Sequence, residues 1–296
     1  MKIMKKIFNK TWTGLVAITL MVGCAKSGIK DSGTGQLVSK SVTQTNAAAT
    51  PLVYTDQCTN GQTITVGASY KLNDNIWGAG TDGAGSQCVW YDSSSGQWGC
   101  NASHTSGTGQ NIKGYPALVR GWIWYNSSGV IWASSSDTSF PVQMSDLKSC
   151  NSNWTMTVPT NGEKYDSAYD IWLDTQSNPN YKPQYEVMVW LNYQGPAYNG
   201  TDFSPIGTKV GSNITVAGNV WNIWEGNNGT NNVYTFRRTT NTSSVSNLDI
   251  KALLVYAQNQ GFIQSSYYLL GIQAGWEIVA GGAFTTTSYT STIVKN

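Results

Sequence analysis

The sequence has few of the residues that build histidine-dependent sites. Its 296 residues include one histidine, His104, which excludes a histidine-based catalytic triad or a multi-histidine metal site away from that position. His104 lies in a segment rich in Asn, Ser, Thr and Gly (101–107), a composition typical of a loop. We therefore interpret His104 as a surface loop residue without a catalytic role.

Charge is also scarce. Charged residues make up 11% of the chain and its net charge is +2, which leaves no basic stripe of the kind that a phosphate backbone requires. Nucleic acid is therefore not an expected partner. Thirteen tryptophans and sixteen tyrosines lie among Asn, Ser, Thr and Gly. Such a surface suits neutral sugars, whose C–H faces stack on aromatic rings, although we expect about half of the tryptophans to fill the core.

An apolar stretch, 12–23, follows four lysines at the N-terminus. This pattern is typical of a signal peptide, and the stretch is shorter than the ~20 apolar residues of a membrane-spanning helix. It ends in Leu-Met-Val-Gly-Cys (20–24), which resembles a bacterial lipobox and implies that residues 1–23 are removed and Cys24 is lipidated. The alternative is an ordinary signal peptide with an incidental cysteine. The expected protein is exported, and is either anchored through Cys24 to the outer membrane or cell surface or secreted.

Residues 24–51 contain many Ser, Thr, Gly, Ala and Gln but almost no large apolar side chain, so they cannot bury enough surface to fold. We predict a flexible tether that holds the following domain ~30 Å from its anchor. Residues 52–296 suffice for one large domain, and neither a second linker nor an internal repeat divides them. We expect this domain to be a monomer.

The few cysteines that follow the tether point to disulfides rather than to a metal. Four cysteines in an exported domain predict two disulfides, and the sequence leaves all three connectivities open. Their spacings match no zinc motif, and we expect neither a metal nor an organic cofactor. The four are Cys58, Cys88, Cys100 and Cys150.

Short segments of alternating polarity recur along the domain, as at 117–124, 154–158 and 185–191, and clusters of Gly, Asn, Asp and Ser separate them. They predict an all-β fold, a two-sheet antiparallel β-sandwich. One segment differs, because apolar residues repeat at helical spacing over 248–261. We predict a single helix there, capped by Ser246 and ended by Gly261.

Only four glutamates occur in the chain, and two of them, Glu186 and Glu277, lie within apolar strands, where burial is costly unless the site uses them. The period of two places Glu186, Met188 and Trp190 on one face of their strand, opposite a core face. We interpret that face as the floor of a sugar-binding cleft.

The strand that carries Glu277 shows the same pattern. Gln273, Gly275 and Glu277 share a face, which Gly271 and Gly275 are predicted to leave open to a ligand. On a third strand, Asp170 is placed to hydrogen-bond a glutamate on a neighbouring strand. Two carboxylates and several tryptophans on one concave face favour glycoside hydrolysis by the two-carboxylate route. The alternative is that these carboxylates form buried ion pairs or a salt bridge at a sheet edge.

Several motifs, in order, resemble glycoside hydrolase family 12, whose members are endo-β-1,4-glucanases and xyloglucanases with a bent β-sandwich (jelly roll), a concave cleft and one helix. The resemblance covers roughly 58–293. Its motifs are Asn-Ile-Trp-Gly at 75–78, Gln-Cys at 87–88, Tyr-Pro-Ala-Leu-Val-Arg-Gly-Trp at 115–122, Ala-Tyr-Asp-Ile-Trp-Leu-Asp at 168–174, Tyr-Glu-Val-Met-Val-Trp at 185–190, Ser-Pro-Ile-Gly at 204–207 and Gln-Ala-Gly-Trp-Glu at 273–277.

The resemblance implies roles for individual residues. Glu186 matches the nucleophile, Glu277 the general acid/base, and Asp170 the aspartate that bonds the nucleophile. Burial and the charge of Glu186 should raise the pKa of Glu277, whereas hydrogen bonds should keep Glu186 ionised. The substrate-binding residues that it implies are Asn75, Trp77, Trp122, Met188, Trp190 and Gln273.

The family pattern also implies a Cys58–Cys88 disulfide, which leaves Cys100 and Cys150 as the second pair. The expected activity of 52–296 is retaining hydrolysis of internal β-1,4 bonds in β-glucan. The alternatives are a xyloglucan-specific endoglucanase and a non-catalytic glucan-binding module on the same fold, while an endo-xylanase is disfavoured by the motifs around the two glutamates. The 194–207 segment looks longer than in many relatives, which leaves the number of subsites open.

Overall fold

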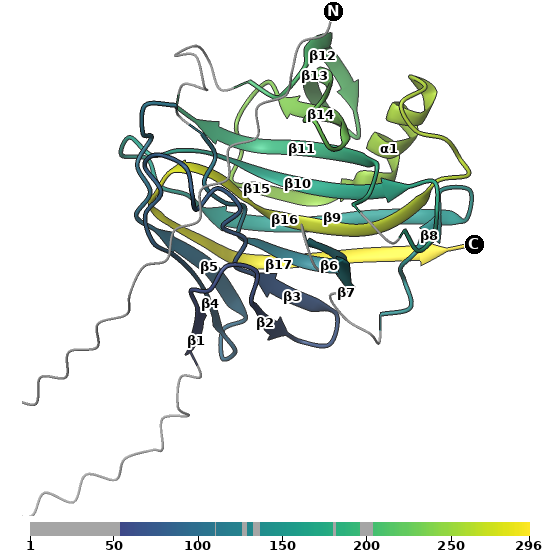
Figure 1. Cartoon of the computed structure of the whole chain (residues 1–296). Helices are drawn as coiled ribbons and strands as arrows, with labels where there is room; N and C mark the ends of the chain where they lie inside the picture. Colours follow the sequence, from purple (N-terminus) through teal and green to yellow (C-terminus); the bar gives the residue numbers. More distant parts are fainter. Residues whose placement is uncertain (1–53, 110, 126–128, 133–136, 180–181, 196–203) are drawn as a thin grey trace, which may run out of the picture. The chain divides into compact units, whose positions relative to one another are not determined.

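The computed structural model describes residues 54–296 except 110, 126–128, 133–136, 180–181 and 196–203 (Figure 1). The predicted signal peptide, Cys24 and the tether lie outside the described residues, as does most of the 194–207 segment. Among the residues that are described, no helix is both long and apolar enough to cross a membrane.

The described strands form two sheets. The smaller has the order β1 (Tyr54–Gln57), β4 (Gln87–Asp92), β5 (Gln97–Ala102), β17 (Ala283–Lys295), β9 (Leu147–Thr157) and β15 (Ser244–Asp249). The larger has the order β12 (Thr208–Val216), β13 (Asn219–Asn227), β14 (Asn232–Arg238), β11 (Tyr185–Gln194), β10 (Lys164–Asp174), β16 (Tyr268–Ala280), β6 (Ala117–Tyr125), β3 (Tyr70–Asn73) and β2 (Thr63–Val66). Two short strands extend it, since β7 (Gly129–Trp132) pairs with β6 and β8 (Val142–Gln143) with β16.

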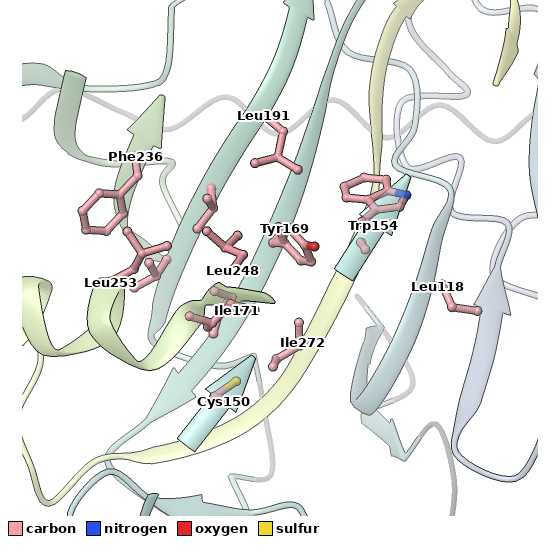
Figure 2. Close-up of a cluster of buried hydrophobic side chains, with 14 of the residues drawn as sticks. Leu118, Cys150, Trp154, Tyr169, Ile171, Leu191, Phe236, Leu248, Leu253 and Ile272 are labelled. Carbon is pink, nitrogen blue, oxygen red and sulfur yellow. The ribbon is translucent and has the colours of Figure 1, made fainter. Parts of the chain in front are cut away.

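The pairings are antiparallel except that β11 runs parallel to β14. The predicted all-β sandwich is therefore confirmed. Side chains of both sheets meet in one core, where Trp154 of β9 packs against Tyr169 of β10 (Figure 2). Full burial of an aliphatic side chain contributes roughly 1.5–3 kcal/mol of transfer free energy, and the rings of Trp and Tyr bury a larger area.

The predicted helix is α1 (Ile250–Asn259). Its buried residues are the four that the helical spacing selects: Ile250, Leu253, Leu254 and Ala257. The predicted cap is wrong, because β15 continues through Ser246 and the N-cap is Asp249, whose side chain accepts a hydrogen bond from the Ala252 N–H at 2.9 Å. Gly261 follows the helix with a φ of 83°, the left-handed conformation expected of a glycine stop.

The cysteines agree with one expected pairing and contradict the other. Cys58 and Cys88 form a disulfide, whereas Cys100 and Cys150 are buried and free. The predicted Cys100–Cys150 pair is wrong because β17 separates their strands, and their partners on it, Phe284 and Ile293, are nine residues apart. That offset is about 30 Å along a strand, whereas a disulfide requires Cα atoms within about 7 Å.

The Cys58–Cys88 bridge closes a loop with a sequence separation of 30. We expect the Cys58→Ser/Cys88→Ser variant to lose about 3–4 kcal/mol of unfolding free energy, because the unfolded chain regains the freedom of that loop. Urea unfolding followed by tryptophan fluorescence measures the difference. Wild-type protein in reductant is the control and should match the variant; equal midpoints for oxidised wild type and variant would contradict the prediction.

His104 is not the exposed loop residue that its surroundings predict. Its side chain is only 4% exposed, because both ring nitrogens have partners inside the protein. The Gly85 N–H donates to Nδ1 at 2.9 Å, and Nε2 lies 3.2 Å from Oε1 of Gln87. Side-chain hydrogen bonding, rather than local composition, therefore determines its burial.

Candidate active site

Four carboxyl groups on three adjacent strands of the larger sheet influence one another's pKa. β10 lies between β11 and β16 and supplies Asp166 and Asp170. Glu186 on β11 pairs with Trp172, and Glu277 on β16 pairs with Asp166. The alternate residues of β10 and β11 point into the main core, so these carboxyl groups lie on the opposite face of the sheet.

The carboxyl groups are withdrawn from water. Asp166, Asp170 and Glu186 are 0%, 4% and 6% exposed, and Glu277 is half-buried. Burial, together with the negative charge of Glu277, raises the pKa of Glu186 to about 8. Burial and the charge of Glu277 thus oppose the ionised form of Glu186 that the sequence predicts. Burial also raises the pKa of Asp170 and of Glu277, so it disfavours ionisation of each of these carboxyl groups.

Asp166 is the functional residue that sequence reasoning missed. It pairs with Glu277 of β16, and burial together with the charge of Glu277 raises the pKa of Asp166 well above the ordinary value. Burial raises the pKa of Glu277 as well, and the interaction with Asp166 lowers it in part. The signal was present, because Asp166 continues the period of two that places Ala168 and Asp170 on one face.

Tyr115 stands beside the second aspartate. Its hydroxyl donates to the Ala168 carbonyl at 3.0 Å and is within hydrogen-bonding reach of the Asp170 carboxyl. A single phenolic proton serves one of these acceptors at a time. Tyr115 therefore fixes β10 at the point where Asp170 faces Glu186, whose charge contributes to the raised pKa of Asp170.

A cleft of about 410 Å³ opens on this cluster, within the usual range for ligand sites. Trp77 is 53% exposed, whereas Gln273 is 6% exposed and Trp172 5%. The lining combines aromatic rings and neutral amides with two carboxyl groups and one lysine, a composition that suits an uncharged polyol. Its residues are Asn60, Asn73, Asn75, Trp77, Tyr115, Asp170, Trp172, Lys182, Glu186, Asn228, Thr230 and Gln273.

Residues 68–294 match the sequence profile of Glycosyl hydrolase family 12. The chain belongs to this family.

Similar proteins and solved structures cover most of the chain. A probable xyloglucan-specific endo-beta-1,4-glucanase A of Aspergillus terreus is 31% identical over 80% of this chain and 87% of its own length. Endoglucanase S of Pectobacterium parmentieri is 31% identical over 72% and 76%. The structure of endoglucanase cel12A from Rhodothermus marinus, 30% identical, covers 82% of the chain and all of its own with a TM-score of 0.70. A family 12 xyloglucanase from Bacillus licheniformis, 25% identical, covers 81% and 100% with a TM-score of 0.68.

Family 12 membership identifies a retaining glycoside hydrolase of the endo-β-1,4-glucanase type. The structure places Asn75, Trp77, Gln273, Asp170 and Glu186 on the cleft, as the sequence predicts. Glu277 is not among the lining residues, and it is joined to the cluster through Asp166 and β10.

Other predicted substrate contacts lie beneath the cleft surface. Met188 and Trp190 are on the expected face but only 6% and 3% exposed, and they pack with Ala168 and Val233. They therefore support the cleft from below.

Trp122 requires a correction. It is 1% exposed and packs against Trp172 and Leu270, so Trp172 rather than Trp122 reaches the cleft. The family resemblance implied a substrate contact for Trp122, and the packing of its ring against Trp172 and Leu270 gives it a supporting position instead.

The open face predicted at Gly271 and Gly275 is also wrong. A Cβ on Gly275 would meet the carbonyl oxygen of Pro116 at 2.3 Å, and one on Gly271 would meet the backbone nitrogen of Trp122 at 2.7 Å. These glycines allow β6 to approach β16 closely, and they do not leave room for a ligand.

Proposed function

We propose that this family 12 chain hydrolyses internal β-1,4 bonds of β-glucans with Glu186 as nucleophile and Glu277 as general acid/base. One observation carries the proposal: Glu186 and Glu277 lie on the two strands that flank β10, on the face where a neutral, aromatic-lined cleft opens. The composition of that cleft matches an uncharged polysaccharide, and two carboxyl groups suffice for the reaction.

The chemistry proceeds in two steps. Protonated Glu277 donates its proton to the departing glycosidic oxygen while the Glu186 carboxylate attacks the anomeric carbon, which breaks the glycosidic bond and forms a glycosyl ester. Glu277, now ionised, takes a proton from the water that attacks the ester, so the sugar leaves and both carboxyl groups return to their starting states. Two inversions at the anomeric carbon give net retention.

The raised pKa values constrain how the cluster holds its protons. Glu186 must be ionised to attack, although burial favours its protonated form. Asp170 is the neighbouring group that can favour the ionised form, because its own pKa is raised and, when protonated, it can donate to Glu186. In this proposal Asp170 supports the nucleophile, and the pair titrates with apparent pKa values that belong to both groups.

A polysaccharide panel tests the proposal. Reducing ends released from barley β-glucan, carboxymethylcellulose and xyloglucan are compared, and proton NMR follows the first product of a soluble oligosaccharide. We expect cleavage with a β-anomer appearing first, because carboxyl groups ~5–5.5 Å apart leave no room for an attacking water. An α-anomer before mutarotation would refute Glu186 as the nucleophile, and binding without release of reducing ends would support the non-catalytic module.

A xyloglucan-specific activity is the second candidate. It is favoured by the Aspergillus terreus relative and the Bacillus licheniformis structure, both named for xyloglucan. Turnover of xyloglucan well above that of mixed-linkage glucan in the same panel would establish the xyloglucan-specific activity.

We also propose that the enzyme is exported and anchored through a lipid on Cys24, on the basis of the lysine-rich start and the Leu-Met-Val-Gly-Cys sequence. The Cys24→Ser variant should move from the membrane fraction to the soluble exported fraction, since several acyl chains are needed for stable attachment. Immunoblots of fractionated cells measure this. A Cys58→Ser variant is the cysteine control and should stay with the membrane; membrane retention of Cys24→Ser would disprove the anchor.

A further inference from the structure

Three buried polar side chains outside the carboxyl cluster form a continuous hydrogen-bonded chain. Nε2 of Gln87 donates to Oδ1 of Asp74 at 2.7 Å, and Oε1 of Gln87 lies 3.2 Å from Nε2 of His104. The Gly85 N–H donates to Nδ1 of His104 at 2.9 Å. Asp74, Gln87 and His104 are 0%, 1% and 4% exposed, and none of them lines the cleft.

The hydrogen bonds permit one arrangement of protons. Because Nδ1 of His104 accepts from the backbone, Nε2 must carry the ring proton and donate to Gln87. The Gln87 amide is then oriented with its NH₂ group toward Asp74. Each link thus fixes the next, and loss of one member leaves buried polar atoms without partners, which costs more than the bond itself contributes.

This chain joins the cleft wall to the other sheet. Asp74 directly follows β3 of the larger sheet, whereas Gln87 begins β4 of the smaller sheet and His104 follows β5. The neighbours of Asp74 in sequence, Asn73 and Asn75, line the cleft, as does Trp77.

The wall segment after β3 has no strand partner of its own and depends on separate bonds. The Tyr115 N–H donates to the Asn75 carbonyl at 2.8 Å, and the Ile76 N–H donates to Oδ1 of Asn60 at 2.8 Å. Gly114 is packed so closely between this wall and Gln87 that an added Cβ would lie 2.5 Å from the Asn75 oxygen and 2.8 Å from Oε1 of Gln87. Gly114 therefore lies in close contact with both Asn75 and the Gln87 amide.

We propose that Asp74, Gln87 and His104 are positioning residues that hold the Asn73–Asn75–Trp77 wall in the geometry that binds the glucan chain. The proposal rests on the proposed function, because it assigns the ligand of that wall. The three residues act through Asn75 and Trp77 and do not touch substrate or the reacting carbon. Their loss should therefore weaken substrate binding and leave the chemical step nearly unchanged.

The Gln87→Met variant tests this, since methionine fills the space of glutamine without its hydrogen bonds. Hydrolysis of cellopentaose should show KM raised on the order of tenfold with kcat within about twofold of wild type, because displacement of a binding group by a fraction of an ångström has effects of this size. Asp74→Asn is the conservative variant: its Oδ1 still accepts from Gln87, so KM should stay near the wild-type value. A fall in kcat at unchanged KM would overturn the proposal.

A double-mutant cycle with Trp77→Ala tests whether Gln87 acts through the wall residue Trp77. Gln87→Met should raise KM much less in the Trp77→Ala background than in wild type, because the ring it positions is gone. Equal factors in the two backgrounds would overturn the proposal. If Gln87→Met does not fold, His104→Leu serves in the same cycle, because it leaves the Asp74–Gln87 bond in place; it should give a smaller rise in KM that is likewise reduced in Trp77→Ala.

Binding without turnover separates this proposal from the proposed function. Cellopentaose affinity is measured by calorimetry in Glu186→Ala protein, with and without Gln87→Met. An affinity loss on the order of tenfold supports the positioning role even if the wild type cleaves no glucan. Unchanged affinity refutes the positioning role even if cleavage is confirmed.

Discussion

Replacement of Glu186 by alanine is expected to reduce kcat by roughly 10⁴–10⁶-fold on every glucan and on activated aryl cellobiosides alike. The reason is that, in the described part of the chain, Glu186 is the carboxylate placed to form the glycosyl ester. Asp170, the other carboxyl group that lines the cleft, lies on the next strand, and Asp166 is fully buried beside Glu277. Initial rates on barley β-glucan and on a dinitrophenyl cellobioside measure the effect.

Glu277→Ala should behave differently on the two substrates. Glucan turnover should fall by roughly 10²–10⁴-fold, whereas the first step with the dinitrophenyl leaving group, which needs no proton, should be spared. Added azide should then give a β-glycosyl azide with Glu277→Ala and an α-glycosyl azide with Glu186→Ala, because it replaces water in the first case and the nucleophile in the second.

The chain provides a matched control, because it contains only four glutamates. Glu225 is exposed on β13 and does not line the cleft, so Glu225→Ala should keep wild-type rates. A dinitrophenyl cellobioside rate preserved in Glu186→Ala would reverse the assignment of the two roles. Equal losses on both substrates for Glu277→Ala would refute it.

Alternation along single strands was readable from the sequence wherever the strand is regular. It correctly placed Glu186 opposite the core face of its strand, which carries Val187 and Val189, because successive side chains of a strand point to opposite faces. The family resemblance, and not alternation, predicted a substrate contact at Trp122, and its burial against Trp172 and Leu270 contradicts that prediction. Alternation within β10 could identify the face of Asp166 but not its partner Glu277, which depends on the pairing of β10 with β16.

Properties that depend on which strands are neighbours could not be read in this way. The free state of Cys100 and Cys150 follows from the position of β17 between β5 and β9. The burial of His104 follows from its contact with Gln87 on the adjacent strand. The family resemblance supplied the catalytic pair, but the contact between Asp166 and Glu277 arises from the pairing of β10 with β16.

That contact leads to a prediction about pH. Burial raises the pKa of Asp166 well above its ordinary value, whereas the interaction with Asp166 lowers the pKa of Glu277. We therefore expect Asp166 to hold the proton of this pair and to act as a donor that stabilises the Glu277 carboxylate. Removal of the donor should raise the pKa of Glu277. The alkaline limb of kcat/KM, where Glu277 loses its proton, should then move to higher pH.

Two variants of Asp166 should shift the alkaline limb of kcat/KM by different amounts. Asp166→Leu removes the donor at similar volume and should shift the alkaline limb upward by about one to two pH units, since a hydrogen bond to a charged group is worth ~1.5–3 kcal/mol and one pKa unit is ~1.4 kcal/mol. Asp166→Asn retains a weaker N–H donor and should shift it less. Profiles measured with cellopentaose report the shift, and the dinitrophenyl cellobioside serves as control, because its alkaline limb does not depend on the Glu277 proton.

The direction of the shift distinguishes the two possible charges of Asp166. An ionised Asp166 would raise the pKa of Glu277 by repulsion, so the neutral variants would move the alkaline limb to lower pH. A downward shift would therefore show that Asp166 is the charged member of the pair. An upward shift of the alkaline limb, larger for Asp166→Leu than for Asp166→Asn, follows only if Asp166 holds the proton and donates a hydrogen bond to Glu277. Asp166 would then be the residue that keeps the pKa of the general acid from rising too far.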